Sequence, residues 1–211
     1  MQKIQTVFLV ESMNKLGKIK LNKKEIKRIE IGIVLIIAVF TVILFIVTRK
    51  PSSEDAQVIV KNQYEKTLDV IGKVATGTNW IDIGDECIEQ EGYIFCKSTK
   101  ENMLSYRDLE KYIESVCTKS YTKEFLSKQE IIYKNIDGDL YVLDASRRKD
   151  VFYAGLKEIK IKSIASHKIQ AQIICEYYID LGKPETYTMS FDYVIEKSWG
   201  SWKTANFTLP Y

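Results

Sequence analysis

The stretch that decides the fold reads KIQAQIICEYYI over residues 168–179, ETYTMSFDYVIEK over 185–197 and SWKTANFT over 201–208. Much of it alternates apolar and polar residues with a period of two, which predicts three β-strands. Only short connections separate these segments, and strands joined by a tight turn run antiparallel. The order therefore predicts an antiparallel meander and excludes a nucleotide-binding fold built from βαβ units.

Working outward, shorter strands are expected over 151–153 and 158–164, and Asp137-Gly138 is a strong hairpin turn just before them. A hairpin-like region is expected over 80–97. Apolar residues at helical spacing predict a helix over 54–74, a second one after Ser105 and a third near Thr122. Helices come first and most strands later, so the predicted class is α+β, with helices packed on one curved antiparallel β-sheet.

Residues 31–48 form an apolar run that no charged residue interrupts. A helix of that length covers about 27 Å, close to the hydrocarbon thickness of a bilayer. We therefore expect a basic cytoplasmic tail over 1–30, a transmembrane helix over 31–48, a spacer over 49–53 and an extracytoplasmic α+β domain over 54–211.

Charge is distributed unevenly about this run. Residues 1–30 carry eight Lys/Arg and three acidic residues, whereas residues 51–211 carry 21 Lys/Arg and 25 acidic residues. The more basic flank of a span normally stays in the cytoplasm, which predicts a single-pass cell-membrane protein with its C-terminal domain outside. The alternative is a cleaved signal peptide. The run is long for one, and Arg49-Lys50-Pro51 stands where small residues would precede a cleavage site.

All four cysteines follow the apolar run, as expected for a domain in an oxidising compartment. A two-residue turn at Glu91-Gly92 would pair Cys87 with Cys96 at a non-hydrogen-bonded position. Cα atoms at such a position are about 4.5 Å apart, within reach of a disulfide, so a Cys87–Cys96 bridge is predicted. Cys117 and Cys175 are either a second pair or two buried thiols.

Residues suited to catalysis lack a recognisable arrangement. The single histidine, His167, falls in a predicted turn without a nucleophile signature beside it. Asp137 and Asp139 resemble the start of a calcium loop, but the glutamate at its twelfth position is missing. The sequence has neither a glycine-rich phosphate loop nor a CxxC pair. We therefore expect a non-enzymatic domain without a metal or cofactor, and its acidic balance argues against binding nucleic acid.

Residues 105–211 carry an ordered set of short motifs. They are YRDLEKYI at 106–113, Tyr121-Thr122, IDGDLYV at 136–142, two long strands and WGSWKT at 199–204. This order resembles the IseA-type DL-endopeptidase inhibitor family of Gram-positive bacteria, in which Asp-Gly-Lys-Leu-Tyr is usual where this chain has DGDLY. The chain also has ASRRK at 145–149 in place of an acidic stretch, and a membrane span in place of a secretion signal.

The resemblance implies an IseA-like, non-enzymatic domain at the cell wall. Such a domain docks on the catalytic cleft of NlpC/P60-type peptidoglycan hydrolases and inhibits them. An acidic surface would steer it toward a basic hydrolase face, while a central apolar patch slows its release. Asp137, Asp139 and Asp144, on the expected projecting hairpin, are the residues predicted to bind the partner.

A short tail, one span and an α+β domain are also typical of NTF2-like or cystatin-like accessory domains, such as VirB8-like components of secretion machines. This alternative predicts a structural or assembly module of an envelope or secretion complex. A hydrolase with an unrecognised carboxylate pair is a third, weaker possibility.

Overall fold

A computed structural model describes residues 23–145, 150–198 and 200–211, without the side chains of 23–28 and 42–48. The contacts within the chain divide it into two units, residues 1–47 and residues 48–211. Residues 1–22 of the predicted cytoplasmic tail lie outside the described residues.

The first unit contains one described helix, α2 (Lys23–Thr48). Its apolar side chains from Ile29 to Phe40 are exposed. Among the residues described, no helix meets the length and hydropathy needed to cross a membrane. The predicted span over 31–48 coincides with the second part of α2, and it stays a prediction.

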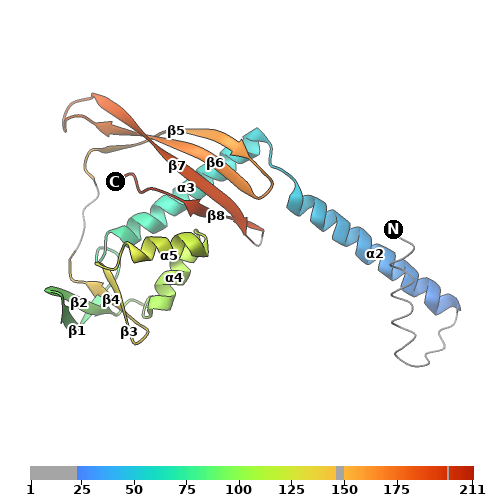
Figure 1. The fold of residues 1–211 in the computed structure, drawn as a ribbon, viewed down its shortest axis with the longest axis horizontal. Coiled ribbons are helices and arrows are strands. Elements are labelled where there is room, and N and C mark those ends of the chain that lie inside the picture. Colours follow the sequence, from blue (N-terminus) through green and yellow to red (C-terminus); the bar gives the residue numbers. More distant parts are fainter. Residues whose placement is uncertain (1–22, 146–149, 199) are drawn as a thin grey trace. The chain divides into compact units, whose positions relative to one another are not determined.

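The second unit is α+β, as the sequence predicts. Its helices are α3 (Ser53–Ala75), α4 (Tyr106–Glu114) and α5 (Lys119–Ser127). Its strands are β1 (Ile83–Gln90), β2 (Tyr93–Ser98), β3 (Tyr133–Ile136), β4 (Asp139–Leu143), β5 (Tyr153–Ile164), β6 (Lys168–Tyr178), β7 (Thr186–Ser198) and β8 (Ser201–Asn206). Figure 1 shows α4 and α5 between the two groups of strands.

The expectation of one curved sheet is wrong, because the described strands form two antiparallel sheets of four. The first sheet has the order β1-β2-β4-β3, and the second has the order β5-β6-β7-β8. Strand β4 already pairs with β2 on one side and β3 on the other, so β5 has no free edge of β4 to join. The chain therefore begins a new sheet at Tyr153.

Strand β5 also differs from its prediction, because the two short strands expected over 151–153 and 158–164 are one strand. Its pairing with β6 shifts register three times, between Tyr153 and Gly155, Leu156 and Glu158, and Ile161 and Ser163. Each bulge inserts an unpaired residue and so breaks the period of two by which a strand is recognised.

Side-chain caps place the helix starts. Ser52 accepts a hydrogen bond from the backbone N–H of Asp55, at 3.0 Å, and so caps α3. Ser105 and Asp108 form a reciprocal capping box at the start of α4, as their spacing predicts. Thr118 caps α5, which therefore begins at Lys119 and not near Thr122 as expected.

The core of the second unit lies between α3 and the second sheet, and it continues under α4, α5 and the first sheet. Alternate residues of β6 are buried: Ile169, Ala171, Ile173, Cys175 and Tyr177. Cys117, between α4 and α5, forms a parallel bridge with Thr204 of β8. Backbone hydrogen bonds from Thr118 N–H to the carbonyl of Thr204 (2.8 Å) and from Thr204 N–H to that of Val116 (2.9 Å) join this connection to β8.

Candidate binding sites

The β1–β2 hairpin has the register that the sequence predicts. Gln90 pairs with Tyr93, and Cys87 pairs with Cys96. The two cysteines form a disulfide with a Cα–Cα distance of 4.0 Å, which confirms the predicted bridge. Both turn residues, Glu91 (φ 56°) and Gly92 (φ 80°), have positive φ, the requirement of a type I′ hairpin turn. The turn fixes which residues face each other, and the disulfide holds that pairing.

An exposed apolar pair follows this turn. Tyr93 and Ile94 are 45% and 53% exposed, and the exposed carboxylates Glu89 and Glu91 lie on the same hairpin. The N–H of Asp144, an exposed residue just after β4, donates to the carbonyl of Ile94 at 2.8 Å. We call these five residues the stapled tip. Exposed apolar side chains near carboxylates, on a covalently fixed hairpin, are typical of a docking surface.

Two of the predicted partner-binding residues, Asp137 and Asp139, lie at the β3–β4 turn, which is the hairpin turn expected at Asp137-Gly138. Asp137 is exposed in that turn with φ 52°. The Asp139 carboxylate lies 2.6 Å from the Nζ of Lys97, and this hydrogen bond raises the pKa of Lys97. The same Lys97 lies 3.5 Å from Glu86. The Tyr141 hydroxyl donates to that Glu86 carboxylate at 2.6 Å, which raises the pKa of Tyr141.

The three predicted carboxylates lie toward the two ends of β4. Asp139 begins β4 and Asp144 follows its end, so about 17 Å of extended strand separates them. Asp137 and Asp139 belong to one end of the first sheet, and Asp144 belongs to the stapled tip.

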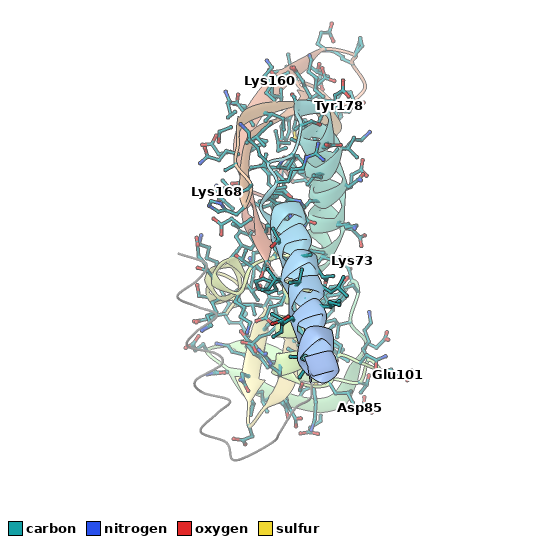
Figure 2. The ribbon with its side chains drawn as sticks, turned by 90° about the vertical axis from the view of Figure 1, so that its right-hand side faces the viewer. Lys73, Asp85, Glu101, Lys160, Lys168 and Tyr178 are labelled. Atoms are coloured by element: carbon teal, nitrogen blue, oxygen red, sulfur yellow. A yellow bond between two sulfur atoms is a disulfide. The ribbon has the colours of Figure 1, made fainter. Side chains whose placement is uncertain are left out.

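Negative charge is concentrated on the first sheet. Residues 83–98 and 133–144 carry seven carboxylates and two lysines, a net charge of −5, whereas the whole of residues 51–211 carries −4. The strands and turns of the first sheet therefore account for the acidity of the entire unit. In Figure 2, Asp85 and Glu101 lie at the lower end of the second unit, while Lys160 and Tyr178 lie at its upper end.

The second sheet has a hydrogen-bonded interior beneath α3. The Thr204 hydroxyl lies 2.6 Å from that of Thr67 and 2.8 Å from that of Tyr193, and all three residues are buried. Gln63, also buried, donates to the carbonyl of Val116 at 2.7 Å. Burial raises the pKa of Tyr193, so its hydroxyl keeps its proton. Side chains fill this interior and satisfy one another, as expected of a scaffold.

The end of the chain completes the same interior. The Tyr177 hydroxyl donates to the carbonyl of Pro210 at 2.5 Å, and the Tyr121 hydroxyl donates to that of Phe207 at 2.9 Å. Burial raises the pKa of Tyr177 to about 12. Residues 207–211 therefore belong to the packing of the second sheet.

A pocket of about 430 Å³ opens beside the C-terminal end of α3. The rings of Trp80 and Tyr112 stack in its wall, with centroids 5.1 Å apart and an interplanar angle of 23°. Lys73 of α3 and Lys100 line it as well, and the buried side chain of Met103 contributes to its lining. The sequence gives little sign of this pocket, because no periodic pattern connects residues 80, 100 and 112. An isolated tryptophan after a helix was the one available signal.

Groups with catalytic potential are separate from these surfaces. His167 is exposed in the β5–β6 turn, and its carbonyl accepts a hydrogen bond from Lys197. Cys117 and Cys175 are buried free thiols, which decides between the two alternatives for them. Burial raises the pKa of Cys117 to about 12, so the thiol stays protonated at neutral pH. Within the described ranges, no three His, Cys, Asp or Glu side chains are grouped to hold a metal ion.

The evidence about function comes from the surfaces described above. No protein-family model matches the chain, and no curated protein matches it either.

Proposed function

We propose that this chain is a membrane-anchored, extracytoplasmic, non-enzymatic domain that binds and inhibits peptidoglycan DL-endopeptidases of the NlpC/P60 type through its stapled tip. The observation that carries the proposal is the exposure of Tyr93 and Ile94 on a disulfide-fixed hairpin that also carries the exposed carboxylates Glu89 and Glu91. A fixed hairpin loses little conformational freedom when it enters a cleft, which favours affinity. Exposed aromatic and aliphatic side chains supply the contact area, and the carboxylates attract a basic partner.

The proposed location rests on the N-terminal unit. Helix α2 has exposed apolar side chains at Ile31, Ile33 and most positions from Val34 to Phe40. Exposed apolar surface of this extent is typical of a segment that contacts lipid or another protein. We propose that residues 31–48 span the cell membrane, with the basic N-terminal tail in the cytoplasm and the second unit outside, where a disulfide persists.

The test is an inhibition assay with a matched pair of variants. The soluble domain, residues 51–211, is added to a purified NlpC/P60-type endopeptidase that digests peptidoglycan. We expect a lower rate of digestion, with weaker inhibition at high ionic strength because the steering charges are screened. The double variant Tyr93→Ser/Ile94→Ser should weaken inhibition by about 30-fold, equivalent to about 2 kcal/mol of contact energy.

The chain supplies its own control for this variant. Tyr178 and Ile179 form a second adjacent Tyr-Ile pair with similar exposures, 38% and 62%, on the second sheet. The double variant Tyr178→Ser/Ile179→Ser should inhibit as well as the unaltered domain. Equal inhibition by all three proteins, or none by any, would contradict the proposal.

One observation favours the second candidate function, an NTF2-like or VirB8-like assembly module. Exposed apolar side chains gather where β6 leads into β7 and just before β5: Val151, Phe152, Tyr178, Ile179, Leu181, Tyr187 and Met189. An apolar surface of this kind suits subunit contacts. In this case the full-length protein should co-purify with other membrane proteins, and Tyr178→Ser/Ile179→Ser should abolish that association while Tyr93→Ser/Ile94→Ser preserves it.

A further inference from the structure

The pocket beside α3 has a fixed aromatic wall. The indole Nε1 of Trp80 donates to the Tyr133 hydroxyl at 3.0 Å, and that hydroxyl donates to the carbonyl of Val74 at 2.6 Å. The Lys100 ammonium lies 4.7 Å from the centroid of the Trp80 ring and donates to the Trp80 carbonyl. Tyr112 stacks on the same indole. Trp80 is therefore held by its edge, its ring and its backbone, although it is only partly buried.

Core packing explains part of this fixation, because Trp80 and Tyr112 both pack against the hydrophobic core. Both side chains are nevertheless only partly buried, and both line the pocket. Ligand pockets of about 300–1,000 Å³ are usually lined by such aromatic surface with a few convergent polar groups, and this one has a volume of about 430 Å³.

The charged groups in and beside the pocket sum to a net charge of zero. Lys73 and Lys100 contribute two ammonium groups, Glu101 lines the pocket, and Asp69 lies 2.7 Å from the Nζ of Lys73. Two positive charges therefore meet two negative ones, which disfavours both a strong anion and a strong cation as ligand. The ammonium of Lys100 over the indole further disfavours a cationic ligand at that ring.

Hydrogen-bonding capacity is nevertheless high. The Asn102 amide offers a donor and an acceptor, Glu101 offers acceptors, and Lys73 keeps donors beyond the one it gives to Asp69. Hydroxyl groups match such a mixture, because each one both donates and accepts. The electron-rich face of an aromatic ring also attracts the weakly positive C–H groups on the flat side of a sugar ring.

We propose that this pocket binds one ring of an uncharged saccharide, which packs against the parts of Trp80 and Tyr112 that line the pocket and hydrogen-bonds with Lys73, Glu101 and Asn102. The proposal does not rest on the inhibition of endopeptidases, and a chain that inhibits nothing could still bind a glycan here. In an extracytoplasmic domain, this pocket would hold the protein against wall polysaccharide.

The experiment is a titration of the full-length protein, solubilised in a detergent without a sugar headgroup, with two neutral probes. These are the trimer of N-acetylglucosamine and the trimer of glucose, followed through the indole N–H signal of Trp80, assigned with Trp80→Phe. We expect saturable shifts with at least one probe. Tyr112→Ala should weaken binding by about tenfold because half the wall is lost. Lys73→Gln should weaken it by about fivefold because a donor is lost.

Two controls make the result specific. Lys66→Gln removes an exposed lysine of the same helix that does not line the pocket, and its affinity should equal that of the unaltered protein. Tyr112→Phe keeps the stacked ring and should retain most of the affinity. The proposal is overturned if neither trimer shifts the Trp80 signal at concentrations up to about 10 mM. It is equally overturned if Tyr112→Ala binds as tightly as Lys66→Gln while its other signals show an intact fold.

Discussion

The two sheets of the second unit are stabilised in different ways. The second sheet places alternate residues of β6 and β7 against α3, and its buried hydroxyls bond one another. The first sheet has β1, a strand whose side chains are all at least partly exposed, and a disulfide joins β1 to β2. Both sheets contribute buried residues to the core, and the first sheet has in addition a covalent bond to its outer strand, β1. We interpret the second sheet as a scaffold. We interpret the exposed part of the first sheet as a surface whose residues can vary to suit a binding partner.

The largest expected effect is in the scaffold. Tyr193 is 1% exposed, its ring lies edge-on to Tyr64 with centroids 5.8 Å apart, and its hydroxyl bonds Thr204. Tyr193→Ala should lower the free energy of unfolding by about 3–5 kcal/mol, measured by urea denaturation, because it leaves a cavity and unpaired hydroxyls. Tyr93→Ala on the first sheet should cost less than about 1 kcal/mol. Similar costs for the two variants would remove the distinction between the sheets.

The next effect is on the first sheet, through its disulfide. Cys87 and Cys96 are nine residues apart, and a loop of that length predicts about 2–3 kcal/mol of stabilisation from restricting the unfolded chain. Adding reductant should lower the urea midpoint by the corresponding amount. The double variant Cys87→Ser/Cys96→Ser should start from that lower midpoint and no longer respond to reductant. A remaining response would show that another disulfide contributes.

Alkaline pH should weaken the scaffold. The pKa of Tyr177 is raised from 10.0 to about 12, chiefly by burial. Between pH 10 and 12 the folded state therefore keeps a proton that the unfolded state loses, so stability falls as pH rises through this window. Urea midpoints at pH 9 to 11.5 should show the decline, and Tyr177→Phe should make it shallower. An unchanged slope in Tyr177→Phe would mean that other buried groups, such as Cys117, account for the decline.

The smallest effect concerns the carboxylates of the β3–β4 turn. Asp137 is exposed, and Asp139 forms an ion pair with Lys97 in which the two side chains are 45% and 32% exposed. Exposed pairs contribute little to stability, so Asp137→Asn/Asp139→Asn should change the melting temperature by less than about 3 °C. Inhibition by the domain should lose part of its salt dependence, because two steering charges are gone. A large loss of stability would assign these residues to the scaffold.

The sequence was most informative where one local rule decides the structure. Ser105 and Asp108 predict a helix start because both halves of the cap lie within four residues. Glu91-Gly92 fixes the turn, and the turn then fixes the register that brings Cys87 to Cys96. These features need no knowledge of the rest of the chain.

Features made by distant parts of the chain were not predictable in this way. The division into two sheets depends on β2 pairing with β4, across more than 40 residues that include α4 and α5. The Trp80–Tyr112 wall and the bond between Thr67 and Thr204 likewise join segments that share no pattern. The sequence also did not show that Asp144 would hydrogen-bond to Ile94 of β2, at the opposite end of β4 from Asp139.

The connection between α4 and α5 has a consequence for self-association. Because residues 116–118 pair with β8, the outer side of that strand is partly covered against strand addition by a second molecule. The opposite border of the sheet is β5, where three bulges and the exposed residues Lys157, Lys160 and Lys162 discourage such addition. Both borders of the meander thus discourage growth of the sheet from one molecule into the next.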